Sequence, residues 1–274
     1  MVCSSKPLTV SLWLQVKVIE NPDADLPDST KKPKKKKETM SVGQSFKFLF
    51  NNTYVRCMAA LVVCYGIAIN LVEVSWKGKL KAQYPNPNDY SQFMGNFSTA
   101  TGIFTFGMML TGRWIFAKFT WLTAALITPI VLGITGLGFF SLLLFGKVVE
   151  PQLAAMSVTP LMAACLMGAA QNVFSKGAKY SLFDPCKEMA YIPLDDEIKT
   201  KSKAAIDVIC NPLGKSGGAL IQQALIIGLG SLSASTPYLG GILLVILSGW
   251  VASAKRLYVE FEQYDTKETR DKHA

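Results

Sequence analysis

Long uncharged stretches alternate with short polar ones along this chain. No charged residue occurs in residues 119–146, 151–175 or 216–254. One bilayer crossing needs about 20 apolar residues, so the first two runs each fit one crossing and the third fits two, with a break at residues 233–237. The pattern predicts about six transmembrane helices of an all-α polytopic membrane protein, and not a soluble enzyme. The expected spans are residues 57–76, 92–116, 121–145, 153–176, 205–232 and 238–258.

These spans divide the chain into three parts. Residues 1–40 form a basic N-terminal segment, and the Pro-, Asp- and Lys-rich residues 20–39 are typical of a disordered linker. Residues 41–258 form the predicted six-helix transmembrane domain, and residues 259–274 form a charged C-terminal tail. Charged residues make up 17% of the 274 residues, below the roughly 25% usual for soluble domains, which agrees with a membrane protein.

The net charge of +9 has a local source in the lysines of residues 31–37. Such a run suits nucleic acid or a nuclear signal, but beside a membrane domain it favours a solvated tail next to anionic lipid. We therefore expect membrane lipid as a partner and no nucleic acid. Six spans place this run, the lysines of residues 176–203 and Lys255-Arg256 on one side of the membrane, which agrees with the positive-inside rule.

Motifs for a metal site or for nucleotide hydrolysis are not found in the sequence. The six cysteines include no CxxC pair and the one histidine is His273, so we expect no metal site. Gly214-Lys215-Ser216 matches the end of a phosphate-binding loop, but Ile209 stands where that loop needs a glycine. We expect no catalytic residue and no resident cofactor.

Glu73 is a charged residue near the end of the first predicted span. Asn70, Glu73 and Lys77 are three and four residues apart, so they share one helix face. An ionisable residue within a bilayer costs about 2.5–3.5 kcal/mol by insertion scales, which makes those that occur there candidates for function. Glu73 is therefore a candidate transport residue, with a local Glu73–Lys77 pair near the membrane surface as the structural alternative.

A longer polar stripe follows one face of the fifth predicted span. Its members are four, four, three and four residues apart: Asp207, Asn211, Lys215, Gly218 and Gln222. A lipid-facing stripe of this kind would be costly, so we expect it to meet water, ligand or another helix. Lys215 is the best candidate for holding an anion, and interhelical packing is the alternative for the stripe.

A third polar group runs out of the fourth predicted span. Asn172, Lys176 and Lys179 lie on one helix face, next to Gln171. The two lysines are candidates for contacting an anion near the entrance of a site. The alternative is a helix end whose lysines extend to the membrane surface.

Three strings in the sequence resemble the ATP/ADP translocases of plastids and bacterial parasites. They are YSLFDPCKEMAYIPLDD at residues 180–196, NLVEVSWK at residues 70–77, and KAAID at residues 203–207 followed by NPLGKSGGALIQ at residues 211–222. The strings are long and unusual in composition. The resemblance covers about residues 41–254, and residues 1–20 lie outside it.

The resemblance implies a fold and a function. Members of the family have about twelve spans arranged like major-facilitator transporters, so this chain corresponds to the C-terminal half, and its polylysine segment to the central loop. The implied activity is exchange of ATP for ADP, with phosphate accompanying ADP, in the inner envelope of the plastid. The family's important intramembrane charges map onto Glu73 and Lys215, and Asn211, Gln222 and Asn172 are then candidates for ribose or base.

The half length leaves other functions open. In such transporters the site lies between two halves, so a missing N-terminal half is an expected partner. A half-size membrane protein with an interaction or regulatory role is one alternative. A carrier of a different organic anion on the same fold is another.

Overall fold

The computed structural model describes residues 42–271, and every regular element in this part of the chain is helical. The predicted linker at residues 1–40, its polylysine run and residues 272–274 lie outside the described residues. The α-helices are α2 (Val42–Asn51), α3 (Thr53–Gln83), α4 (Pro87–Lys118), α5 (Trp121–Ala155), α6 (Pro160–Ala178), α7 (Asp184–Met189), α8 (Asp196–Ala205), α9 (Asn211–Leu229) and α10 (Leu232–Asp271). Two π-helical turns join them: η1 (Lys179–Phe183) before α7 and η2 (Ile206–Cys210) before α9.

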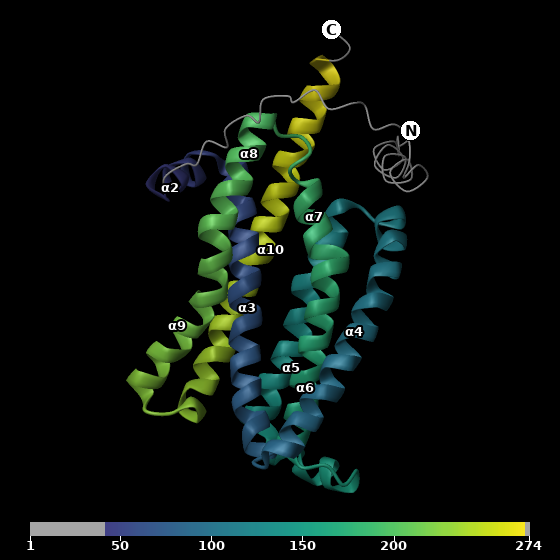
Figure 1. Cartoon of the computed structure of the whole chain (residues 1–274), viewed down its shortest axis with the longest axis vertical. Coiled ribbons are helices and arrows are strands. Elements are labelled where there is room, and N and C mark those ends of the chain that lie inside the picture. Colours follow the sequence, from purple (N-terminus) through teal and green to yellow (C-terminus); the bar gives the residue numbers. More distant parts are fainter. Residues whose placement is uncertain (1–41, 272–274) are drawn as a thin grey trace, which may run out of the picture.

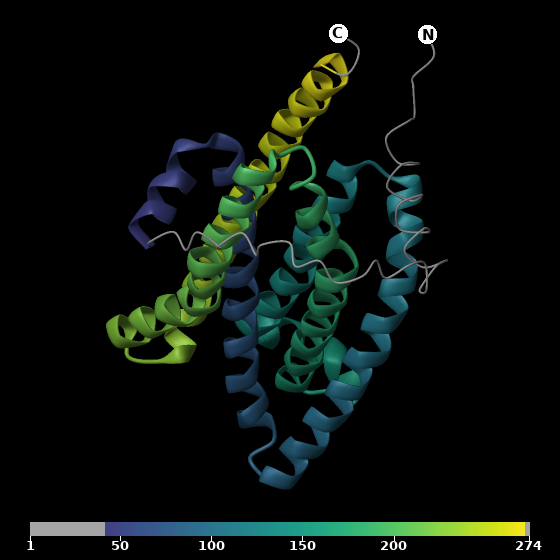
Figure 2. The ribbon, with the colours of Figure 1, turned by 45° about the horizontal axis from the view of Figure 1, so that its top comes forward.

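The long helices run up and down along one axis (Figure 1). The connections α3–α4, α5–α6 and α9–α10 lie towards one end of the bundle, while α2, α7, α8 and the C-terminal end of α10 lie towards the other. The tilted view agrees, and also shows α2 leaving the bundle sideways (Figure 2). This alternation places both ends of the described chain at the same end of the bundle.

Three of the described helices are long and apolar enough to cross a membrane: Thr53–Gln83, Trp121–Ala155 and Leu232–Gln263. They correspond to the first, third and sixth predicted spans. The helices α4, α6 and α9 carry more polar residues, among them Lys215, Gln222 and Gln223 in α9 and Gln171 and Asn172 in α6. The second, fourth and fifth spans stay predictions.

Two predicted boundaries were wrong by several residues. The fourth helix begins at Pro160 and not at residue 153, because α5 continues through a kink at Phe145 and because Thr159 caps α6 by accepting a hydrogen bond from the Met162 amide. The break in the third uncharged run lies at residues 230–231 and not at 233–237. Gly230 ends α9 with a left-handed backbone (φ 79°), which glycine adopts without strain, and the Ser231 side chain accepts from the Ala234 amide at the start of α10.

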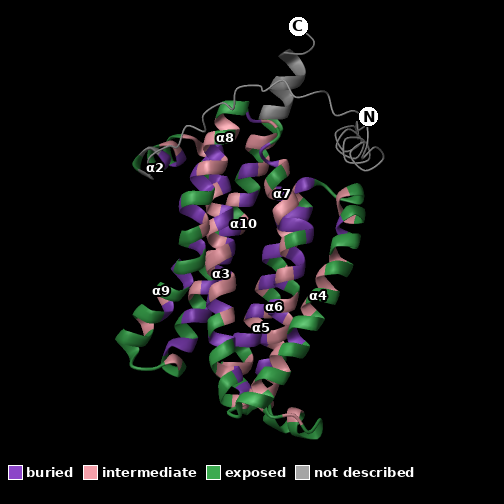
Figure 3. Ribbon diagram, in the orientation of Figure 1, coloured by how far each residue is buried: buried purple, intermediate pink, exposed green. Residues whose placement is uncertain are grey.

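Helix α3 lies at the centre of the bundle, packed against α6, α9 and α10. The buried Trp76 indole donates a hydrogen bond to the Cys165 carbonyl of α6 at 2.8 Å. At the end nearer α8, the Tyr54 hydroxyl donates to the Ala190 carbonyl at 2.6 Å. Buried residues follow the inward faces, while α4 and α9 carry long exposed stretches (Figure 3). Many exposed side chains are large and apolar, as expected where lipid or another part of a membrane protein covers them.

Candidate functional site

The packing of α9 on α3 sets the depth of Lys215 in the bundle. A Cβ atom on Gly66 would lie 2.6 Å from the Cα atom of Gly214, so the two backbones nearly touch there. Further along, Gly218 packs on Asn70 and the Gln222 side chain bonds to α3. The two helices therefore run parallel in register, and Lys215 lies close to the level of Gly66.

The packing of α6 on α3 gives the depth of Lys176 in the same way. The Tyr65 ring of α3 stacks on the Phe183 ring at 4.3 Å between centroids, and a Cβ on Gly168 would meet the Trp76 ring. Residues 168–183 thus run antiparallel to residues 65–76. Lys176 lies between these two contacts, near the level of Asn70. Lys215, Lys176 and Glu73 consequently all lie along the middle third of α3.

Glu73 forms an ion pair within its own helix. Its carboxylate lies 2.7 Å from the Lys77 ammonium, and the side chains are 26% and 46% exposed. The local pair considered from the sequence is therefore formed, and in this structure Glu73 does not hold a lysine from another helix. Partial exposure keeps the pair weak, which leaves the carboxylate available to a competing cation.

The predicted stripe on α9 divides into two parts. Gly218 and Gln222 pack against α3, as the packing alternative expected. Lys215 is exposed and has no carboxylate partner among the described residues, while Asn211 donates a hydrogen bond to the Asp207 carboxylate at 2.9 Å. The close contact at Gly214 turns this side of α9 towards α3, so Lys215 lies at the margin of the packed face.

Gln222 and Asn172 are buried polar residues whose side-chain amide nitrogens donate hydrogen bonds within the bundle. Gln222 donates to the Leu71 carbonyl and the Ser75 hydroxyl, both at 2.8 Å. Asn172 donates to the Gly168 carbonyl of its own helix at 2.8 Å. The side-chain oxygens of both amides are buried without a partner in the described part of the chain. Their assignment to ribose or base stays a prediction.

Lys176 and Lys179 have different surroundings although they are one helical turn apart. The Lys176 ammonium lies 5.1 Å from the centroid of the Phe97 ring of α4, and the described residues offer it no carboxylate. The Lys179 ammonium lies 3.6 Å from the Asp184 carboxylate and 4.6 Å from the centroid of the Tyr180 ring. Of the two, Lys176 is therefore the cation that is free to meet an anion.

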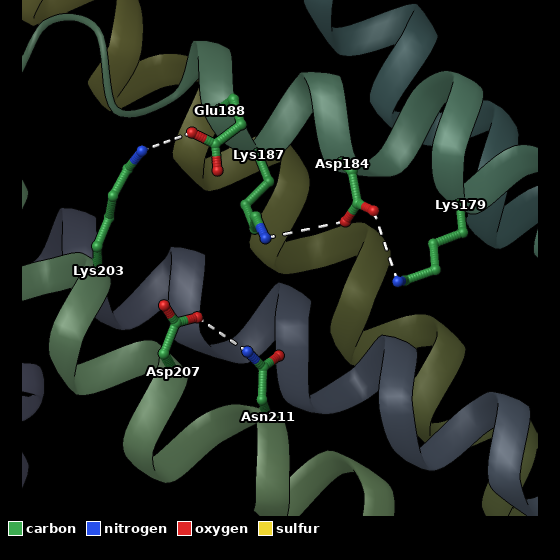
Figure 4. A network of polar contacts seen from close by, with 7 residues as sticks. All are labelled: Lys179, Asp184, Lys187, Glu188, Lys203, Asp207 and Asn211. Atoms are coloured by element: carbon green, nitrogen blue, oxygen red, sulfur yellow. Dashed lines mark hydrogen bonds and ion pairs between the residues drawn. The ribbon is translucent and has the colours of Figure 1, made fainter. Parts of the chain in front are cut away.

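Polar contacts cluster around η1, α7, α8 and η2, and one of them joins α7 to α8 (Figure 4). Asp184 lies between Lys179 and Lys187, at 3.6 and 3.8 Å from their ammonium groups, and Lys203 lies 2.6 Å from Glu188. The picture shows Lys187 directed towards the space above Asp207 and Asn211. Sequence analysis missed both kinds of pair. The spacing of Asp184 and Lys187 could have predicted theirs, whereas the Lys203–Glu188 contact depends on how α8 packs on α7.

Burial and negative charge also shift two groups beside this network. Burial, together with the carboxylates of Asp207 and Glu188, raises the pKa of Tyr191 well above its usual range. Burial raises the pKa of the Cys186 thiol to about 12. Both groups are therefore neutral at physiological pH. Sequence analysis assigned a role to neither of them.

Each π-helical turn comes directly before an Asp-Pro or Asn-Pro pair. The Asp184 amide donates to the Lys179 carbonyl, and the Asn211 amide to the Ile206 carbonyl, five residues back. Proline lacks an amide hydrogen and crowds the preceding turn, so a widened turn accommodates Pro185 and Pro212. The backbone therefore widens locally at η2, just before Pro212.

Three described helices that are long and apolar enough to cross a membrane define the class as a helical membrane protein. The family model described as "TLC ATP/ADP transporter" matches residues 2–261. The chain belongs to this family. The match begins at residue 2, so the expectation that residues 1–20 lie outside the family was wrong.

Curated relatives agree with the family. The chain is 62% identical over 252 residues to the plastidic ATP/ADP-transporter of Solanum tuberosum, covering 92% of this chain and 40% of the relative. It is 60% identical over 241 residues to the chloroplastic ADP,ATP carrier protein 1 of Arabidopsis thaliana, covering 88% of this chain and 39% of the relative. It is 50% identical over 246 residues to ADP,ATP carrier protein 1 of Chlamydia trachomatis, covering 89% and 46%. The chain thus spans less than half the length of these relatives. No solved structure matches it.

Proposed function

We propose that this chain is the C-terminal half of an ATP:ADP antiporter of the plastid inner envelope. Its long helices form six spans, equivalent to one half of a major-facilitator-like transporter that works by alternating access. Family membership and the names of the plastid relatives support the substrates and the location. The observation that carries the proposal is Lys215, an unpaired cation at the middle depth of a transporter bundle.

The charges explain why the transporter exchanges nucleotides. ATP must lose water and counterions from its phosphates to enter the bundle, and Lys215 replaces part of that shell by charge-assisted contact. Lys176 and Lys179 continue the row of positive side chains from Lys215 towards the end of the bundle that carries α8. A site that is strongly basic when empty reorients poorly, so return with ADP, and with phosphate beside it, is favoured over return of the empty site.

Glu73 acts in this scheme as a competitor for cations. It holds Lys77 in this structure. When the phosphates of a bound nucleotide attract nearby lysines, less positive charge remains to neutralise Glu73. The positions of the helices that carry these charges therefore depend on whether nucleotide occupies the site. Asn211, Gln222 and Asn172 add polar contacts for ribose and base once rearrangement frees their amides.

Because the chain spans less than half the length of its relatives, the test compares it with a full-length protein. We would measure ATP uptake into ADP-loaded liposomes with two proteins: this 274-residue chain, and a fusion in which the chain replaces the matching part of the potato transporter. We expect the fusion to exchange ATP for ADP and the chain alone to be much slower, because it supplies half of the site. A fusion that inserts and folds but does not exchange nucleotides would contradict the proposal.

A further inference from the structure

A groove of about 440 Å³ lies between α4 and α6, beside the site described above. These two helices lie side by side in both views of the ribbon (Figures 1 and 2). Residues 97–109 of α4 form one wall, and Lys176 and Tyr180 form the other. Its volume falls within the range of about 300–1,000 Å³ that is usual for small-molecule sites.

The wall formed by α4 carries several small polar residues beside its apolar ones. Ile103, Leu110 and Trp114 are seven and four residues apart on one exposed side, and all are large and apolar. The groove side instead carries Ser98, Thr101, Gly102 and Thr105, together with Phe106 and Met109. Lipid contact explains the first side. The Thr101 hydroxyl donates to the Phe97 carbonyl of its own helix at 2.7 Å, and its oxygen can still accept a hydrogen bond. Together with Ser98 and Thr105 beside a lysine, it suits water or a polar ligand.

Lys176 supplies the positive charge of the groove. Its ammonium faces the Phe97 ring, and no described carboxylate neutralises it. It lies near the level of Asn70, within two turns of the depth of Lys215.

Tyr180 supplies an aromatic surface that is held in place. The Lys179 ammonium lies over its ring at 4.6 Å, and Asp184 holds that ammonium in turn. Even so, 51% of Tyr180 is exposed, and Phe106 across the groove is 66% exposed. Because Lys179 covers only part of the Tyr180 ring, the exposed part of the ring is available to stack with a flat, uncharged aromatic group.

We propose that the groove between α4 and α6 is the adenosine subsite, with the base against Tyr180 and Phe106. The hydroxyl groups of Ser98, Thr101 and Thr105 meet the ribose, and Lys176 meets the phosphate nearest to it. The proposal rests on the nucleotide exchange proposed above and names the residues that distinguish a nucleotide from a bare polyphosphate.

The test compares two ligands on the whole 274-residue chain in lipid nanodiscs. Radiolabelled ATP is displaced with unlabelled ATP or with inorganic tripolyphosphate, and the ratio of the two affinities measures recognition of adenosine. Base stacking contributes about 1–3 kcal/mol, so Tyr180→Leu should lower the preference for ATP about fivefold or more. Tyr180→Phe should keep the preference, and Lys176→Gln should weaken both ligands.

Tyr238→Leu is the matched control, because Tyr238 is 54% exposed but lies on α10, away from the groove. A preference for ATP that is unchanged in Tyr180→Leu would overturn the subsite and leave the proposed exchange standing. Failure of the unmodified chain to bind ATP, while the fusion with the potato transporter exchanges nucleotides, would also overturn the subsite. A fusion that does not exchange nucleotides would contradict the exchange itself. An azido-ATP label that ATP protects and that maps outside residues 97–109 and 176–180 would also overturn the subsite.

Discussion

The contact between Gly66 and Gly214 sets the depth of Lys215, and replacing Gly66 by alanine tests it. A new Cβ would lie 2.6 Å from the Gly214 Cα and 2.7 Å from its carbonyl carbon. Favourable carbon contacts lie at about 3.5–4.0 Å, so α3 and α9 would have to separate locally by about 1 Å. Such overpacking costs about 1–3 kcal/mol, which corresponds to a fall of about 2–12 °C in unfolding temperature for a chain of this size.

The assay is thermal unfolding in detergent, followed by a dye that becomes fluorescent on reacting with newly exposed cysteines. Five cysteines in the described residues are free, and four of them are buried, so unfolding gives a clear signal. Gly102→Ala is the control, because no atom lies within 4 Å of a Cβ added there. If Gly66→Ala and Gly102→Ala unfold at the same temperature, the close approach of α3 and α9 is refuted, and so is the depth assigned to Lys215.

Three further predictions follow from single contacts. Trp76→Phe removes the donor to the Cys165 carbonyl and should cost about 1–3 kcal/mol, measured as a lower unfolding temperature. Because its pKa is raised to about 12, Cys186 carries almost no thiolate at pH 8 and should resist maleimide until the chain is unfolded, as mass spectrometry would show. The exposed Lys203–Glu188 pair should show a coupling of about 0.2–1 kcal/mol in a double-mutant cycle of unfolding, and a larger value would contradict its exposure.

The sequence predicted the long helices because membrane helices need long uncharged stretches. The predicted gap between the first two spans contains the true boundary, where Asn86 caps α4 and Pro87 begins it. The end of α5 was misplaced because the charged residues Lys147 and Glu150 ended the uncharged run, and the start of α10 because the small and hydroxyl residues 233–237 were read as a break. In an apolar setting those residues continue a helix, and Pro237 lies inside α10.

The candidate charges were identified from the sequence, but their partners were not. The spacing of Glu73 and Lys77 was sufficient to predict their pair, because a helix brings such residues together. By contrast, the contact of Lys176 with Phe97 and the packing of Gln222 on Ser75 depend on how helices pack. Helical periodicity gives the face of one helix, and it does not say which neighbour that face meets.

Charge reversal at Lys215 tests the central claim of nucleotide exchange most directly. The measurement is uptake of labelled ATP into ADP-loaded liposomes by the fusion with the potato transporter, with Lys255→Glu, on α10, as the control. We predict that Lys215→Glu abolishes uptake, that Lys215→Arg retains part of it and that the control is active. Uptake by Lys215→Glu at the rate of the unmodified fusion would contradict the account.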